Sequence, residues 1–235
     1  MKMLIEMLGR RPVYARVVPF AVFLILTAGQ GLFGEASRYW FYLAKTFVGA
    51  WLIWAMRPLV SEMRWKVSWE AVVIGVAVFG VWVGVSGEWT TQASLWVKLG
   101  LTKPPAEPMR LWNPHAHFGE GSALAWLFII TRIAGSTLVV PPLEEVFYRS
   151  FLYRYIAKVD FQSVSLGHFA WTPFLLTALI FGFVHQEWLA GILCGFAYQG
   201  LVIWKKRLGD AMTAHAITNF LLGLWVVSKG AWQFW

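Results

Sequence analysis

The sequence predicts an all-α membrane protein, a bundle of about seven transmembrane helices in one domain that covers residues 1–235. Composition is the first reason: 58% of the residues are hydrophobic and only 14% are charged. Such values are typical of polytopic membrane proteins and exclude an ordinary soluble domain. The second reason is that apolar runs near the bilayer-crossing length of roughly 20 residues alternate with short basic clusters.

Seven apolar runs supply the predicted helices, near residues 13–34, 38–56, 69–86, 122–154, 170–185, 188–204 and 211–227. Lys2, Arg10 and Arg11 precede the first run, which we predict to be an uncleaved helix because no small-x-small cleavage site follows Leu26. The basic clusters at 2–11, 57–66, 154–158 and 205–207 predict that these loops and the N-terminus are cytoplasmic. The net charge of +8 therefore indicates contact with the lipid bilayer and no nucleic acid partner.

Two stretches do not fit a simple helix. Taken as one helix, residues 122–158 would rise about 50 Å, more than a bilayer core of about 30 Å. We therefore expect a break or kink at Pro141 and Pro142, because proline removes a helical hydrogen-bond donor. Residues 87–121 are polar and proline-rich, and they are expected to be either a lid or an ordinary surface loop.

An acidic motif, Glu144-Glu145-x-x-x-Arg149, interrupts the fourth apolar run. Each ionisable side chain at membrane depth costs at least about 2.5–3.5 kcal/mol, so the three residues need partners or a task. Glu145 and Arg149 have i,i+4 spacing and can pair, whereas Glu144 is rotated away from that face. Glu144 is therefore the candidate for chemistry. An ion-pair cluster that seals a helix end is the alternative.

Two further motifs place polar groups in apolar runs. They are Phe181-x-x-x-His185 and His215-x-x-x-Asn219, each with its two residues on one helix face. A single membrane histidine more often serves a hydrogen bond between helices. Convergence of the three motifs in the bundle interior would explain all of them together.

Such a set of groups suffices to hydrolyse a peptide bond without a covalent intermediate. A carboxylate with a neutral imidazole can activate water as a general base. A second imidazole with an amide can stabilise a developing oxyanion. One observation conflicts with a shared site: by helix rise, His215 lies about 9 Å from the basic side and His185 about 22 Å. We attribute this mismatch to inexact span boundaries.

Other chemistries lack their sequence signatures. The chain has no H-E-x-x-H zinc helix, no G-x-S-x-G serine motif and no glycine-rich phosphate loop, so we expect no cofactor. Cys194 is the only cysteine, which excludes an intramolecular disulfide or a zinc–thiolate cluster. We expect Asp210 to cap the seventh helix. Lys45 and Arg132 are expected to snorkel or form ion pairs, and the alternative is that they line a cavity.

The three motifs, in this order and on separate apolar helices, resemble those of the CAAX-protease and bacteriocin-processing family of intramembrane glutamate proteases. The resemblance covers residues 122–227. It implies that Glu144 and His185 activate water and that His215 and Asn219 stabilise the oxyanion, with Glu145 and Arg149 in support. The short chain is also similar to a bacterial subgroup associated with exosortase systems, which implies a bacterial inner membrane.

The leading hypothesis is thus an intramembrane endopeptidase that cuts near the membrane surface and uses no metal. Its partner is a peptide or protein substrate at the membrane, and the sequence leaves open whether that substrate is prenylated. One alternative is a zinc-dependent hydrolase with Glu144, His185 and His215 as ligands. Another is a non-enzymatic membrane scaffold or partner-binding subunit that keeps its polar groups for helix packing.

Overall fold

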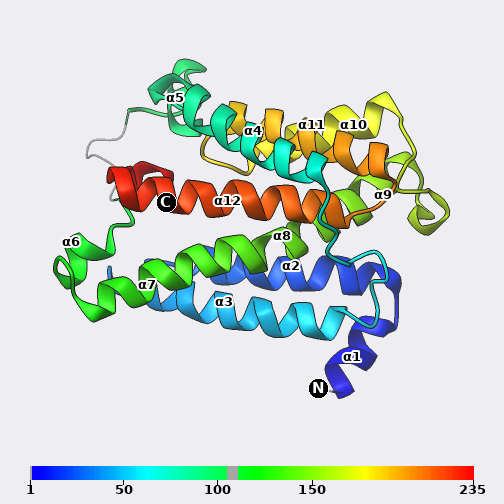
Figure 1. Ribbon diagram of the computed structural model, residues 1–235, viewed down its shortest axis with the longest axis horizontal. Helices are drawn as coiled ribbons and strands as arrows, with labels where there is room; N and C mark the ends of the chain where they lie inside the picture. The colour runs from blue at the N-terminus through cyan, green and yellow to red at the C-terminus, as the bar shows by residue number, and fades with distance from the viewer. Residues whose placement is uncertain (1, 105–110) are drawn as a thin grey trace. The chain divides into compact units, whose positions relative to one another are not determined.

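A computed structural model describes residues 2–104 and 111–235, so part of the proline-rich stretch, residues 105–110, lies outside the described chain. Helices account for most of the described residues, which form no β-strand and a single isolated bridge between Thr91 and Glu187 (Figure 1). The all-α prediction is confirmed. The chain divides into a first unit (Met1–Arg64, Leu111–Phe147 and Asn219–Trp235) and a second unit (Trp65–Arg110 and Tyr148–Thr218).

The first unit is built around an aromatic core. Tyr39, Tyr42, Trp112 and Phe128 are buried together, and the Arg132 guanidinium lies 4.3 Å from the Trp112 ring centroid. Arg132 is thus held against aromatic faces, not by the ion pair or snorkelling predicted for it. The helices of this unit are α1 (Lys2–Gly9), α2 (Pro12–Ala28), α3 (Ser37–Met56), α6 (Pro114–Phe118), α7 (Ala123–Ala134), α8 (Val140–Glu145) and the short η5 (Trp232–Phe234).

In the second unit, α10 and α11 pack closely through small residues. A Cβ on Gly182 would stand 2.2 Å from Ile192, and one on Gly191 would stand 2.9 Å from the Gly182 Cα, so both positions require glycine. The elements here are α4 (Trp69–Val85), η1 (Glu88–Thr90), α5 (Gln92–Lys98), α9 (Tyr153–Ala157), η4 (Phe161–Ser163), α10 (Trp171–Phe183) and α11 (Trp188–Lys205). The last helix, α12 (Gly209–Lys229), begins in the second unit and ends in the first.

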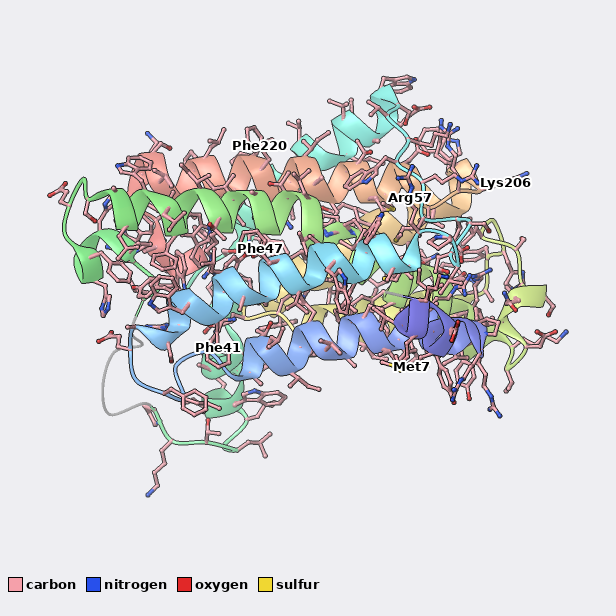
Figure 2. All side chains as sticks on the ribbon, turned by 90° about the horizontal axis from the view of Figure 1, so that it is seen from below. Met7, Phe41, Phe47, Arg57, Lys206 and Phe220 are labelled. Carbon is pink, nitrogen blue, oxygen red and sulfur yellow. The ribbon has the colours of Figure 1, made fainter. Side chains whose placement is uncertain are left out.

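Three helices are long and apolar enough to cross a membrane by length and composition: Ala123–Ala157, Trp188–Lys205 and Gly209–Lys229. A fourth span is possible if α1 and α2, which are bent by 118°, count as one. The apolar helices α4 and α10 are shorter. Large apolar side chains such as Phe47 and Phe220 are exposed on the helices (Figure 2), as expected for residues that face lipid. These helices indicate a membrane protein. The count of seven spans stays a prediction.

The helix does not break at Pro141 and Pro142, because Ala123–Ala157 is one helix of 35 residues, and a kink at the two prolines stays a prediction. Two π-helical segments, Gly135–Val139 and Val146–Leu152, flank α8 and the two prolines. In the first of these segments the Val140 N–H bonds to the Gly135 carbonyl, five residues back. This wider turn absorbs the missing proline donors without ending the helix.

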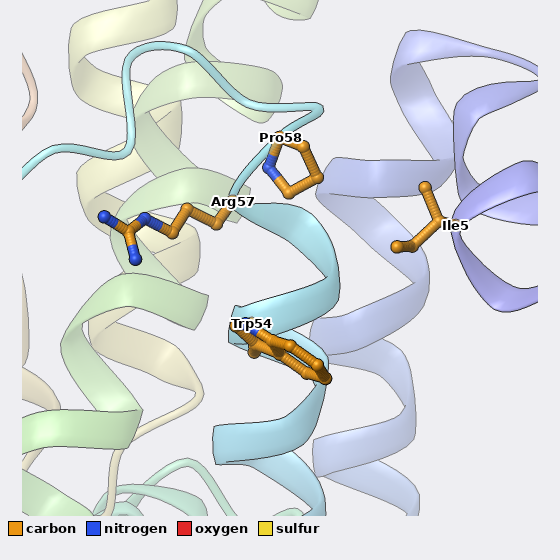
Figure 3. Close-up of a pocket in the computed structure, with 4 residues that line it drawn as sticks. All are labelled: Ile5, Trp54, Arg57 and Pro58. Carbon is orange, nitrogen blue, oxygen red and sulfur yellow. The ribbon is translucent and has the colours of Figure 1, made fainter. Parts of the chain in front are cut away.

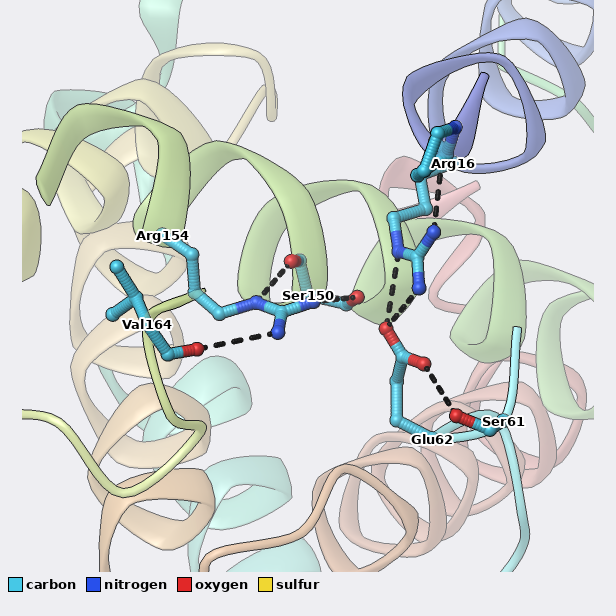
Figure 4. Close-up of polar contacts among 7 residues, drawn as sticks. Arg16, Ser61, Glu62, Ser150, Arg154 and Val164 are labelled. Atoms are coloured by element: carbon cyan, nitrogen blue, oxygen red, sulfur yellow. Dashed lines mark hydrogen bonds and ion pairs between the residues drawn. The ribbon is translucent and has the colours of Figure 1, made fainter. Parts of the chain in front are cut away.

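Ion pairs and hydrogen bonds anchor the ends of several helices. In the first unit, Arg16 on α2 donates to Glu62 at 2.7 Å (Figure 4). In the second unit, Arg154 on α9 donates to the carbonyl oxygens of Ser150 and Val164 (Figure 4). These contacts hold one basic residue near the beginning of α2 and one in α9.

Asp210 does not precede α12 as a cap but lies in its first turn. Its carboxylate accepts hydrogen bonds from Ser68, which caps α4, and from Arg207. Asp210 thus joins the beginnings of α4 and α12 inside the second unit.

A hollow of about 440 Å³ lies beside the end of α3 in the first unit (Figure 3). Ile5 of α1 lines it on one side, and Trp54, Arg57 and Pro58 line it on the other. Tryptophan and arginine at a helix end are typical of the membrane–water interface. The hollow contains none of the predicted site residues.

Candidate active site

The two carboxylates of the acidic motif lie in α8, between the π-helical segments. Glu145 is fully buried. Glu144 is half-buried, and its Oε2 is a buried atom without a hydrogen-bond partner among the described residues. Because burying an unsatisfied carboxylate oxygen is costly, this atom marks a place where function and stability compete.

Lys45 of α3 interacts electrostatically with Glu144 within the first unit. Its Nζ donates to Thr27 Oγ1 at 3.1 Å and stands 4.4 Å from the Tyr42 ring centroid. Only 6% of Lys45 is exposed, so the predicted snorkelling is wrong. The lysine amine is instead buried in an apolar setting, where it interacts with Glu144, Thr27 and the Tyr42 ring.

Asn219 is hydrogen-bonded to the first π-helical segment, Gly135–Val139. Its Nδ2 donates to the Ser136 carbonyl at 2.8 Å, and both residues belong to the first unit. In the π-helical register the next donor for Ser136 would be Pro141, which has no N–H. The proline therefore leaves the Ser136 carbonyl open to the asparagine. Since an amide nitrogen carries two N–H groups, Asn219 keeps a second donor for another acceptor.

In the second unit, both predicted histidines pack against Phe181. The ring centroids of His185 and Phe181 are 4.5 Å apart, and those of His215 and Phe181 are 6.4 Å apart. His215 is also stacked on Tyr198, with centroids 5.1 Å apart, and is 4% exposed. Both imidazoles thus lie beside one ring, and α10 ends at Phe183, before His185, while the depths of the two histidines in a membrane stay a prediction.

The tautomer of His185 follows from a single hydrogen bond. Its Nδ1 stands 2.6 Å from the Phe181 carbonyl oxygen, which can only accept, so Nδ1 carries the proton. The neutral ring then has its lone pair on Nε2. The Trp82 ring meets the imidazole edge-on at 5.7 Å and further limits its orientation. The hydrogen bond and the Trp82 ring together fix the orientation of the imidazole.

Arg149 lies in an aromatic cage. Its guanidinium carbon is 4.2 Å from the Phe181 ring centroid, 5.5 Å from that of Tyr148 and 5.7 Å from that of Tyr198. Only 1% of the residue is exposed, a setting in which cation–π attraction is strong. The predicted pair of Arg149 with Glu145 stays a prediction.

A hydrogen-bonded chain that sequence reasoning missed supports His215. The Tyr198 hydroxyl donates to Thr218 Oγ1 at 2.7 Å, and Thr218 in turn lies 2.8 Å from the Gly75 carbonyl oxygen. A Cβ on Gly75 would come within 2.6 Å of the Ala214 carbonyl, so α4 can approach α12 only at a glycine. The sequence signal for this hydrogen-bonded chain is Thr218, which stands directly before the motif residue Asn219.

The six predicted site residues therefore fall into two groups. Glu144, Glu145 and Asn219 belong to the first unit, and Arg149, His185 and His215 belong to the second. Within the described residues, no group of three or more His, Cys, Asp or Glu side chains that could hold a metal ion is found.

Comparison with known proteins finds one family that resembles part of the chain. Residues 122–221, which contain all six residues, match the family model described as type II CAAX prenyl endopeptidase Rce1-like. No curated protein and no solved structure matches the chain. Residues 122–221 are thus similar to the Rce1-like type II CAAX prenyl endopeptidases, a family of peptidases.

Proposed function

We propose that the protein is an intramembrane endopeptidase that hydrolyses a peptide bond near the membrane surface with a water activated by Glu144 and His185. The observation that carries the proposal is the hydrogen bond from His185 Nδ1 to the Phe181 carbonyl. It fixes the tautomer that a general base needs, and it does so in a peptidase family.

In the proposed reaction, Glu144 and Nε2 of His185 take a proton from water as its oxygen attacks the scissile carbonyl carbon. His215 and the second N–H of Asn219 donate hydrogen bonds to the resulting oxyanion. The proton then passes to the leaving nitrogen, the C–N bond breaks, and a carboxylic acid and an amine are released. No bond forms between substrate and enzyme.

The other motif residues have supporting roles in this proposal. Glu145 is fully buried and Arg149 is enclosed by aromatic rings, so neither is suited to meet a substrate directly. They hold the ends of α8 and the π-helical segment that follows it. Lys45 balances the charge of Glu144 from α3.

The nature of the nucleophile can be tested with isotopic water. The purified protein in liposomes is given matched C-terminal peptides, farnesylated and unmodified, in H₂¹⁸O with hydroxylamine. Direct attack by water predicts one ¹⁸O in the new carboxyl group and no hydroxamate by mass spectrometry. A hydroxamate would reveal an acyl-enzyme and contradict the proposal.

Metal chelation separates the proposal from the zinc-dependent alternative. We expect the cleavage rate to be unchanged after dialysis against 1,10-phenanthroline, with less than stoichiometric zinc by elemental analysis. Loss of activity that zinc alone restores would support Glu144, His185 and His215 as metal ligands instead.

The role of the π-helical segment leads to a further prediction. Pro141→Ala adds an N–H that competes with Asn219 for the Ser136 carbonyl. Loss of one hydrogen bond of about 0.5–1.5 kcal/mol predicts a kcat lower by roughly 2- to 10-fold. Pro142→Ala is the matched control, because its N–H is one residue out of register. Equal kcat values for the two variants would show that Ser136 does not hold Asn219 for catalysis.

A further inference from the structure

Glu187 is a buried carboxylate that the proposed reaction does not use. It follows His185 by two residues, lies in the turn between α10 and α11, and is only 8% exposed. Burial raises the pKa of Glu187, and hydrogen bonds from Thr90 and Ser86 oppose that shift. A turn residue is expected to be solvated, so its burial needs a structural cause.

Glu187 is buried because it contacts the segment formed by η1 and the start of α5. The Thr90 hydroxyl lies 3.2 Å from Glu187 Oε2 and donates to it, in a fully buried position. The same hydroxyl accepts the Gly87 N–H at 2.8 Å, which fixes the threonine side chain. Thr90 is thus held in place before it meets Glu187.

Backbone hydrogen bonds extend this contact to both sides of His185. The Gln92 N–H donates to the Gln186 carbonyl at 2.8 Å, beside the bridge between Thr91 and Glu187. The Gln92 side-chain amide donates to the carbonyl of Phe183, the last residue of α10. Carbonyls at a helix end lack intrahelical donors, so this contact closes the end of α10.

We propose that residues 87–92 form a clamp that positions His185 by binding the turn at residues 183–187. The acceptors of the clamp, Phe183 and Gln186, stand on either side of His185 in the chain, so the clamp fixes the backbone from which the imidazole projects. α4, which precedes the clamp, presents Trp82 to the imidazole edge. The importance of the clamp for catalysis rests on the proposed role of His185 as a base. Glu187 is a positioning residue in this proposal.

A disulfide that replaces the hydrogen bonds tests the clamp. Thr91 and Glu187 are bridge partners, so their Cα atoms lie at a separation that suits a disulfide. The variant is Thr91→Cys/Glu187→Cys in a Cys194→Ala background, which removes the only native cysteine. We expect the reduced form to lose about tenfold in kcat, and the oxidised form to return to within a few fold of the Cys194→Ala parent.

Each other outcome contradicts the proposal. If oxidation leaves kcat low although the disulfide has formed, the Glu187 carboxylate acts in the chemistry and not in positioning. If the reduced form is as active as the parent, the contact has no effect on the site. Glu187→Gln, which keeps the size and hydrogen-bonding capacity of the neutral acid, is the matched control and should stay near the parent rate.

Amide hydrogen exchange tests the clamp without reference to activity. Glu187→Ala should accelerate exchange at least about tenfold in peptides that cover residues 183–187, and leave the later turns of α11 unchanged. Glu187→Gln should leave both regions near the parent values. Unchanged exchange in Glu187→Ala would overturn the clamp even if cleavage is affected. Accelerated exchange would support it even if Glu144 and His185 prove not to be catalytic.

Discussion

Replacing Glu144 with glutamine is expected to lower kcat for peptide cleavage by about 10²- to 10⁴-fold, the usual contribution of a positioned general base. The amide cannot accept the proton of the attacking water. Glu144 lies in α8 with a buried Oε2 that the described residues leave without a hydrogen bond, so the substitution breaks no described hydrogen bond of that atom and loses only the charge that interacts with Lys45. The melting temperature should therefore fall only modestly.

The measurement is a single-turnover cleavage assay combined with thermal unfolding in detergent. Glu145→Gln serves as the control, because Glu145 is fully buried and its neutral variant should mainly lower the melting temperature. Full activity of Glu144→Gln against a confirmed substrate would exclude Glu144 as the base. A non-enzymatic scaffold predicts a different pattern: Glu144→Gln and His215→Ala lose stability or assembly, and no cleavage product exists for any variant.

Replacing His185 with asparagine is expected to lower kcat by about 10²- to 10³-fold while the fold is kept. The asparagine amide can donate to the Phe181 carbonyl as Nδ1 does, but it has no counterpart of the basic Nε2. His185→Ala should lose the same activity and also about 1 kcal/mol of stability, because the carbonyl loses its donor.

Comparing the two variants separates the two nitrogen atoms. If His185→Asn cleaves at nearly the parent rate, the histidine acts only through its hydrogen bond to Phe181, and Nε2 is not a base. If both variants unfold at the same reduced temperature, the asparagine has not replaced that hydrogen bond, and the loss of activity reflects structure.

The sequence predicted the all-α class and several of the helices, because both depend on local patterns. Residues 69–86 and 188–204 were predicted as apolar runs, and the structure has helices at Trp69–Val85 and Trp188–Lys205. Helical periodicity also placed Phe181 on the face of His185, where the rings lie 4.5 Å apart. Spacing along one helix requires no knowledge of the other helices.

The contacts that support the site depend on residues far apart in the chain. Ser136 receives Asn219 across 83 positions, and Gln92 reaches Phe183 across 91. No periodicity connects such pairs. The two prolines illustrate the same limit: their missing donors predict a break, yet a π-helical turn and a side chain from another helix accommodate them.

The long helix Ala123–Ala157 also couples the protein to the lipids around it. Its 35 residues rise about 52 Å, whereas the hydrocarbon core of a bilayer is about 30 Å thick. Hydrophobic mismatch of this kind is relieved by tilt, by protruding ends and by local deformation of the bilayer. The acyl-chain length of the lipids sets the bilayer thickness, and it can therefore be varied to change the mismatch. Thicker membranes hold the helix more upright, and the level of Glu144 in the bilayer shifts with the angle.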